Sequence, residues 1–206
     1  MKVLVILAHP HKESFNHAIA CSAVDALKAK GHRAVFHDLY EEKFDPVLPY
    51  EEIPRAGIVD PIITKYCNEL TEAGGIIFVH PNWWGQPPAI LKGWIDRVIR
   101  PGVAYLFEEG DSGEGIPQGL LEGKRALVFN TSNTPDEREK KVFGDPLENM
   151  WKKCIFELCG ITEYKRRTFN VIVTSTREER DTWLKEAHNI VDEFFQKDLV
   201  YLNSKF

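Results

Sequence analysis

The sequence predicts an α/β protein whose parallel sheet is doubly wound, with helices on both faces. The first observation is a set of short apolar runs rich in valine, isoleucine and leucine, which is typical of strands buried on both sides. The second is that segments with helical spacing alternate with these runs. The length of 206 residues suits one domain of ordinary size, so we expect a single domain over residues 1–206.

The first half of the chain supplies two strands and two helices. Residues 2–8 form a continuous apolar run that predicts the first strand, and residues 33–39 (RAVFHDL) predict the second. A helix is predicted between them over 15–30, because apolar residues recur on one face and Gly31 ends the segment. This half is completed by a proline-containing connection over 40–57 and a helix over 60–73.

The second half continues the alternation. Residues 75–79 (GIIFV) predict a third buried strand, and Pro88 marks the first turn of a helix over 89–99. Residues 101–123 carry six glycines and an acidic run over 108–114, so we expect an exposed excursion there. The remaining predicted elements are a strand over 125–130 (RALVFN), a helix over 146–158, a strand over 164–173 and a last helix over 177–197.

Composition and charge narrow the class of protein. The net charge of −5 argues against nucleic acid as the main partner, because phosphate binding needs a basic surface. We interpret the basic cluster over 165–167 as a solvated sheet edge or a local anion contact. The four cysteines form no Cys-x-x-Cys pair and no secretory signal is visible, which favours reduced thiols and a cytoplasmic location. The N-terminal apolar run is too short to span a bilayer, so we expect no membrane-embedded part.

The loop after the first strand is a candidate binding site, because open α/β sheets bind ligands beyond the carboxyl ends of their strands. Residues 9–16 (HPHKESFN) contain no glycine, which excludes the glycine-rich dinucleotide turn and the Gly-Lys-Ser/Thr phosphate loop. The loop offers His9, Ser14 and Asn16 beside a helix N-terminus, which attracts phosphate. Taken alone, Ser14 is better explained as a helix cap. No metal is expected, because nothing in the spacing completes a site around His9 and His11.

Two further loops follow strands whose ends reach the same sheet edge. The loop over 80–88 (HPNWWGQPP) carries adjacent tryptophans, Trp83 and Trp84, which can form an apolar wall for a large flat cofactor. The alternative is that one tryptophan packs inward, but this does not account for both. The loop over 130–135 (NTSNTP) supplies a dense set of hydroxyl and amide groups, although alone it is equally explained as a polar turn. The case for a binding site therefore depends on the convergence of the three loops.

Several stretches of the chain resemble the NAD(P)H dehydrogenase (quinone) family of flavodoxin-like proteins, which includes DT-diaphorase and small bacterial relatives. The likeness is patchy and runs from residue 3 to about 175. The most specific stretch is Pro-Ala-Ile-Leu-Lys-Gly-Trp over 88–94. A flavodoxin-like fold implies five parallel strands in the order 2-1-3-4-5. The matching pieces are His9 with Ser14-Phe15-Asn16, Asp38-Leu39-Tyr40, Pro81 to Trp84, and Pro88 to Val98 with Ala104-Tyr105 beyond.

The resemblance implies a flavin cofactor, FMN favoured over FAD, with NAD(P)H as co-substrate. It implies a ping-pong reaction in which NAD(P)H reduces the flavin, nicotinamide leaves, and a quinone-like acceptor takes two electrons. It also implies a homodimer with Trp94 and residues 101–107 near the interface. The implied cofactor contacts are His9, Ser14, Phe15 and Asn16 for the phosphate, Pro81, Asn82, Trp83, Trp84 and Gly85 for the isoalloxazine ring, and Thr131, Ser132, Asn133 and Thr134 for its pyrimidine edge.

One departure from DT-diaphorase concerns catalysis. That enzyme has a tyrosine and a histidine after its fourth strand, whereas residues 132–150 contain neither, and Phe143 falls where the histidine would be. Hydride transfer to a flavin needs no protein acid or base, so we expect an enzyme without assigning a catalytic side chain. The identity and protonation of the quinone are left open by this loss.

Two other functions stay open on the sequence. A flavodoxin-type electron carrier would bind FMN and pass one electron at a time, although the Ser/Thr-rich phosphate loop usual in flavodoxins is absent. An ancillary regulatory subunit of a potassium-efflux system is a role that some relatives have. The NAD(P)H oxidoreductase is ranked first because three loops and the family resemblance favour it.

Overall fold

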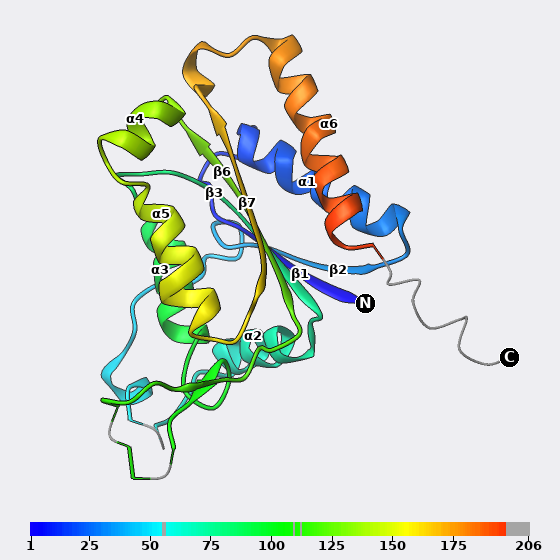
Figure 1. Cartoon of the computed structure of the whole chain (residues 1–206). Helices are drawn as coiled ribbons and strands as arrows, with labels where there is room; N and C mark the ends of the chain where they lie inside the picture. The colour runs from blue at the N-terminus through cyan, green and yellow to red at the C-terminus, as the bar shows by residue number, and fades with distance from the viewer. Residues whose placement is uncertain (55–56, 109, 112, 197–206) are drawn as a thin grey trace, which may run out of the picture.

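The core of the protein is a five-stranded parallel sheet (Figure 1). The computed structural model describes residues 1–54, 57–108, 110–111 and 113–196. The strand order is β2-β1-β3-β6-β7, which confirms the predicted order because β4 and β5 form a separate ribbon. The sheet strands are β1 (Lys2–Leu7), β2 (Arg33–Asp38), β3 (Gly75–Pro81), β6 (Arg125–Ser132) and β7 (Glu163–Asn170).

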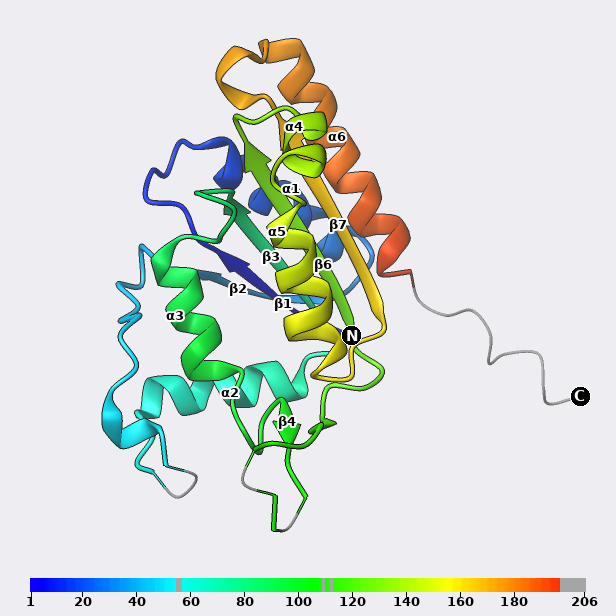
Figure 2. The same ribbon diagram turned by 60° about the vertical axis from the view of Figure 1, so that its left-hand side comes forward.

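Helices cover both faces of this sheet, as predicted (Figures 1 and 2). One face carries α1 (Phe15–Ala29) and α6 (Arg177–Phe194). The other carries α2 (Pro61–Glu72), α3 (Ala89–Val98), α5 (Pro146–Glu148) and the wider π-helix η2 (Asn149–Glu157) that continues α5. Val3 and Val5 of β1 pack toward the first layer, whereas Leu4 and Ile6 pack toward the second. This burial on both sides explains why the strand reads as an unbroken apolar run.

Some element boundaries differ from the sequence-based expectation. β6 continues to Ser132, so Thr131 and Ser132 belong to a strand end instead of a loop. The fifth sheet strand ends at Asn170 and is followed by the short helix η3 (Ile172–Thr174). The last helix ends at Phe194, and position 197 of the prediction lies outside the described residues. The sequence also did not predict η1 (Tyr50–Glu52) or α4 (Asp136–Lys141).

The glycine-rich segment over 101–123 is only partly an exposed excursion. It contains a two-stranded antiparallel ribbon of β4 (Tyr105–Leu106) and β5 (Gln118–Gly119). A Cβ atom on Gly119 would lie less than 3.0 Å from the backbone of Cys159 and Gly160, so the ribbon packs tightly against the end of η2. Within the acidic run over 108–114, positions 109 and 112 lie outside the described residues.

The basic cluster over 165–167 lies on the edge strand β7. Arg166 pairs with Asp145 and Glu148, and Arg167 pairs with Glu186. Because carboxylates neutralise both guanidinium groups, the sheet-edge interpretation fits better than an anion site. All four cysteines are free thiols. Among the described residues, no helix combines the length and apolar character that crossing a bilayer would require.

The family stretch over 88–94 has a packing role in α3. The Trp94 side chain is fully buried in the core. Gly93 faces the backbone of Pro46, and a Cβ at this position would lie well under 3.0 Å from the Pro46 carbonyl oxygen. One turn later, buried Arg97 donates to Glu52 at 2.6 Å and to the Asp45 carbonyl at 2.7 Å. The stretch therefore fastens the long connection to α3, and the expectation that Trp94 lies at a subunit interface is wrong.

We predict that Gly93→Ala destabilises the protein by about 1–3 kcal/mol, because the added methyl group overpacks the α3–Pro46 contact. Urea unfolding followed by circular dichroism measures this difference. Lys92→Ala is the matched control, since its exposed ion pair with Asp96 contributes about 0.5 kcal/mol or less. Equal stability of the two variants would contradict the close approach of α3 to Pro46.

Candidate functional site

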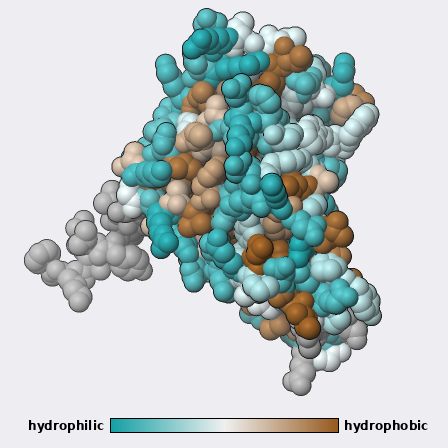
Figure 3. Space-filling model, turned by 180° about the vertical axis from the view of Figure 1, so that it is seen from behind, coloured by the Kyte–Doolittle hydropathy of each residue, from teal (hydrophilic) through white to brown (hydrophobic). Residues whose placement is uncertain are grey.

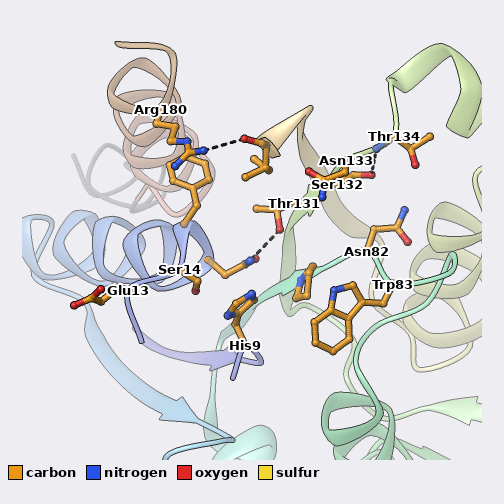
Figure 4. Close-up of a pocket in the computed structure, with 14 residues that line it drawn as sticks. His9, Glu13, Ser14, Asn82, Trp83, Thr131, Ser132, Asn133, Thr134 and Arg180 are labelled. Carbon is orange, nitrogen blue, oxygen red and sulfur yellow. Dashed lines mark hydrogen bonds between the residues drawn. The ribbon is translucent and has the colours of Figure 1, made fainter. Parts of the chain in front are cut away.

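Three loops predicted to converge do so around one cavity at the carboxyl ends of β1, β3 and β6 (Figure 4). The register explains the convergence, because Leu7 pairs with Val79 and Val79 pairs with Phe129. The cavity has a volume of about 400 Å³. Eleven predicted residues line it, namely His9, Ser14, Phe15, Asn16, Pro81, Asn82, Trp83, Thr131, Ser132, Asn133 and Thr134.

The N-terminus of α1 forms one wall of the cavity. Ser14 caps the helix, since its hydroxyl oxygen accepts the backbone N–H of His17 at 3.3 Å, and its side chain also lines the cavity. The cap interpretation and the site interpretation therefore hold together. The N–H groups of Phe15 and Asn16 belong to the first helical turn, where no intrahelical acceptor exists. This end of a 15-residue helix has the chemistry that an anion requires.

His9 faces this helix end. Its Nδ1 lies 3.1 Å from the backbone nitrogen of His11 and 3.3 Å from the His11 carbonyl oxygen, so the loop backbone holds the ring in place. Burial lowers the pKa of His9, and the neighbouring His17 and His11 act in the same direction. No metal cluster forms around it, since the described residues contain no group of three or more His, Cys, Asp or Glu side chains positioned for an ion.

Asn16 carries a buried atom that the protein leaves unsatisfied. The side chain is 3% exposed, and its Nδ2 donates to Thr131 Oγ1 at 2.9 Å. Its Oδ1 is buried without a hydrogen-bond partner in the described part of the chain. A buried polar atom without a partner costs about 1–3 kcal/mol, so the site is suited to a ligand that donates a hydrogen bond there. The hydroxyl or N–H groups of a flavin supply such donors, and the residues present fit that cofactor.

The two tryptophans sit on a tight turn that holds both of them out of the core. Trp83 and Gln86 exchange backbone hydrogen bonds of 3.0 and 3.1 Å, and the two residues between them have positive φ, +57° at Trp84 and +72° at Gly85. A tryptophan rarely adopts this conformation, which marks the turn as strained. Trp83 is 42% exposed and faces His9 across the cavity, whereas Trp84 is fully exposed. Neither tryptophan packs inward.

Asn82 supports this turn from within. Its Oδ1 accepts the N–H of Gly85 at 2.9 Å, and its Nδ2 donates to Glu139 Oε1 at 2.9 Å. Any Cβ on Gly85 would lie less than 3.0 Å from Pro146, so the turn also packs against the start of α5. The Asn82 side chain therefore positions the tryptophans.

The end of β6 is fixed by its own hydrogen bonds. Ser132 Oγ accepts the N–H of Thr134 at 3.0 Å, and Asn133 Oδ1 accepts the N–H of Val173 at 2.9 Å. The Thr131 hydroxyl accepts from Asn16, and its own hydrogen is not used in that bond. These hydrogen bonds hold the loop in one conformation.

A buried histidine stands directly behind the cavity wall. His80 is 0% exposed, and burial lowers its pKa to about 4. Its Nε2 accepts from Asn130 at 2.8 Å and from the Trp151 indole at 3.1 Å, so its Nδ1–H donates to the Pro81 carbonyl at 2.9 Å. The neutral ring fixes the Pro81 backbone, which lines the cavity.

Arg180 is a cavity residue that the sequence reasoning missed. It lies in the first turns of α6, where its Nε donates to Ser175 at 2.8 Å and its Nη2 donates to the Ile172 carbonyl at 2.9 Å. It places a positive charge on the same cavity (Figure 4). Its only signal in the sequence is a position just after the fifth sheet strand, beyond the three loops from which the site was predicted.

Trp84 and Gly85 line a second cavity of about 460 Å³ instead of the first. The second cavity shares Asn82 and Thr134 with the first, so the two adjoin. Phe143, the residue in place of the family histidine, is 54% exposed and lines it together with Glu139 and Pro146. This adjoining space is bordered by aromatic rings.

The comparisons with known proteins agree with this geometry. A family model described as flavodoxin-like fold matches residues 1–193. The chain belongs to the flavodoxin-like family. A Haemophilus influenzae protein named as an uncharacterized NAD(P)H oxidoreductase is 35% identical over 176 residues, covering 84% of this chain and 85% of the relative. Human ribosyldihydronicotinamide dehydrogenase [quinone] is 32% identical, covering 73% of this chain and 72% of the relative.

A solved structure supports the same assignment for this flavodoxin-like protein. A Streptococcus mutans protein superposes with a TM-score of 0.81 at 31% identity, covering 94% of this chain and all of the other. The predicted resemblance is confirmed, and so is the prediction of an enzyme, because the relatives are named as NAD(P)H oxidoreductases and dehydrogenases. The comparisons do not favour the electron carrier or the regulatory subunit.

Proposed function

We propose that this flavodoxin-like protein is a flavin-dependent NAD(P)H oxidoreductase that passes two electrons to a quinone-like acceptor. The observation that carries the proposal is the convergence of residues 9–16, 81–83 and 131–134 on one cavity. The unpartnered Asn16 Oδ1 and the free helix N-terminus within that cavity fit the polar groups of a flavin. When bound, the flavin accepts a hydride from the nicotinamide and releases two electrons to the acceptor.

The phosphate of the flavin is assigned to the N-terminus of α1. Ser14 and the first-turn N–H groups meet there, and the His9 imidazole adds a further polar group on the same cavity. This single phosphate site supports FMN as the favoured cofactor. Arg180 on the same cavity would suit the second phosphate of FAD, which keeps FAD as the alternative.

The ring of the flavin is assigned to the space between Trp83 and the end of β6. Trp83 supplies the aromatic wall, and the Thr131 hydroxyl with the groups of the following loop faces the pyrimidine edge. Fixed donors at that edge stabilise the negative charge that the ring gains on reduction. Pro81, held by His80, keeps the facing backbone in place.

The second cavity is the proposed subsite for nicotinamide and, in turn, for the acceptor. Trp84 and Phe143 present exposed aromatic surfaces on which a flat ring can stack. The absence of the family tyrosine and histidine from residues 132–150 leaves proton supply to solvent. A quinone-like acceptor fits this arrangement because water can protonate it after electron transfer.

The direct test is reduction of the bound cofactor. Protein purified with FMN or FAD is mixed anaerobically with NADH or NADPH, and loss of the flavin absorbance is followed by stopped flow. Rapid bleaching, followed by recovery when a quinone is added, is the expected result. Chromatography of the released cofactor identifies FMN or FAD. A protein that retains neither flavin, or a flavin that neither nucleotide bleaches, would overturn the proposal.

The two tryptophans line different cavities, so their substitution should have different effects. We predict that Trp83→Ala weakens FMN binding about threefold to tenfold, because an aromatic contact contributes about 0.5–1.5 kcal/mol beyond its buried area. Trp84→Ala should leave FMN affinity close to wild type and raise KM for the acceptor, since its side chain borders only the second cavity. Flavin fluorescence titration and steady-state kinetics measure the two effects. A larger loss of flavin with Trp84→Ala than with Trp83→Ala would refute the division.

The predicted homodimer is proposed to use the end of the molecule that carries η1 and the β4–β5 ribbon. Hydrophobic side chains gather at the lower right of Figure 3, which corresponds to that end in Figure 1. They include residues more than 35% exposed: Val47, Leu48, Tyr50, Ile53, Ile58, Ile62, Leu106 and Ile116. Leu106 is exposed and belongs to the segment 101–107, so that segment remains part of the proposed interface. Trp94 is buried in the core and does not reach this surface.

Light scattering after gel filtration should give twice the chain mass of 23.6 kDa. Ile58→Glu should shift the protein toward one copy, because a charge on an apolar interface is costly to desolvate. Leu158→Glu, an exposed apolar position at the end of η2, is the control and should stay dimeric. A wild-type monomer at micromolar concentration contradicts the homodimer. The single domain over 1–206 and the cytoplasmic location stay predictions.

A further inference from the structure

A serine, a histidine and an aspartate form a hydrogen-bonded relay beside the proposed phosphate site. The His17 ring lies between Ser14, with Nδ1 2.9 Å from Oγ, and Asp38, with Nε2 2.8 Å from Oδ2. The His17 and Asp38 side chains are only 15% and 12% exposed. Ser14 lines the cavity, while the other two stand behind it. Helix capping accounts for Ser14, but it does not account for a carboxylate held on the far side of the ring.

Asp38 fixes which nitrogen of His17 carries a hydrogen. Its Oδ1 accepts the backbone N–H groups of Tyr40 at 3.1 Å and Glu41 at 3.2 Å, so the carboxylate is held in one orientation. The Oδ2 then accepts from Nε2–H of His17 whether the ring is neutral or charged. The nitrogen whose hydrogen-bonding role stays variable is therefore Nδ1, which faces Ser14.

The state of Nδ1 decides what Ser14 can offer to the cavity. The Ser14 oxygen already accepts the backbone N–H of His17. With a neutral ring, the single hydroxyl hydrogen of Ser14 is directed to Nδ1, and only oxygen lone pairs face a phosphate. With a charged ring, Nδ1–H donates to the oxygen, and the hydroxyl hydrogen is released toward the cavity. A phosphate favours the second state, because it gains a donor and a nearby positive charge.

Other ionisable groups around the relay do not perform this switch. His9 packs edge-on against His17 at a centroid distance of 6.4 Å, but burial lowers its pKa and so disfavours its charged form. The Lys12–Glu41 pair joins the same two loops in solvent, with side chains 70% and 57% exposed. His11 and Glu13 belong to the loop and are exposed. Asp38 is the one carboxylate that contacts the His17 ring in the described residues.

We propose that His17, oriented by Asp38, is a positioning residue that couples binding of the flavin phosphate to uptake of one proton through Ser14. The proposal rests on the proposed function, because it takes the phosphate at the N-terminus of α1 from there. The ligand class is a phosphomonoester flavin, and the relay predicts affinity that rises as the pH falls. It assigns a role to His17 and Asp38. In the sequence alone, these two residues stand out only as parts of a helix start and a strand end.

The test is the dissociation constant of FMN as a function of pH, measured by quenching of flavin fluorescence from about pH 5.5 to about pH 8.5, the range in which histidines change charge. At the acid end of this range, wild-type protein should bind FMN about tenfold more tightly than His17→Gln does. The reason is that a charge-assisted hydrogen bond contributes about one tenfold step in affinity. Ionisation of the FMN phosphate itself occurs near pH 6 and is common to both proteins.

Three controls make the outcome specific. Riboflavin, which lacks the phosphate, should show the same pH profile with wild type and His17→Gln. Ser14→Ala should lose most of the His17-dependent difference, because the hydroxyl transmits it. His11→Gln, an exposed histidine of the same loop, should behave as wild type, and thermal unfolding confirms that each variant is folded.

The outcomes separate this inference from the proposed function. If FMN binds but the wild-type and His17→Gln profiles coincide, the relay is refuted while the flavin site stands. If riboflavin shows the same His17-linked pH dependence as FMN, the proton is not coupled to the phosphate and the relay is again refuted. If neither flavin binds to folded wild-type protein, the proposed function itself fails.

Discussion

The hydrogen-bonded register of three adjacent parallel strands is the constraint on which the site depends. In β1, β3 and β6, Leu7, Val79 and Phe129 lie at one level of the sheet. Beyond that level each chain leaves the apolar core at the same rim, so polar loops that are far apart in sequence become neighbours. A hydrogen bond from Asn82 N–H to the Thr131 carbonyl, 2.7 Å long, then joins two of these chain segments at the rim. The cavity is a consequence of pairing within the sheet.

The sequence predicted those elements whose pattern is local. Buried parallel strands read as apolar runs, and the residues that follow their carboxyl ends include most of those that line the cavity. Trp84 lines the adjoining cavity, which the sequence could not indicate, because its position depends on two positive φ angles and on packing of Gly85 against Pro146, neither of which leaves a periodic pattern. Arg180 was missed because it reaches the cavity from α6, outside the three predicted loops. The His17–Asp38 contact was missed because it joins α1 to the end of β2.

The stretch that carries the strongest family resemblance contributes to packing more than to chemistry. Gly93 allows the Pro46 backbone to approach α3, Trp94 fills the core, and Arg97 neutralises buried Glu52. These contacts hold the long connection after β2 against the sheet's second layer. This specific motif therefore indicates the fold. The chemistry depends on the residues at the rim, where the resemblance is weaker and residues such as Phe143 depart from it.

Several groups that cost folding free energy lie at that rim. Trp84 adopts a strained backbone conformation, Asn16 keeps a buried oxygen without a partner in the described part of the chain, and His80 is held neutral by burial. The Trp84 turn and the Asn16 oxygen border the two adjoining cavities, which argues that these two features are maintained for a ligand. Binding that satisfies Asn16 and covers the exposed aromatic rings would recover part of this cost, so cofactor affinity and protein stability are linked through the same few side chains.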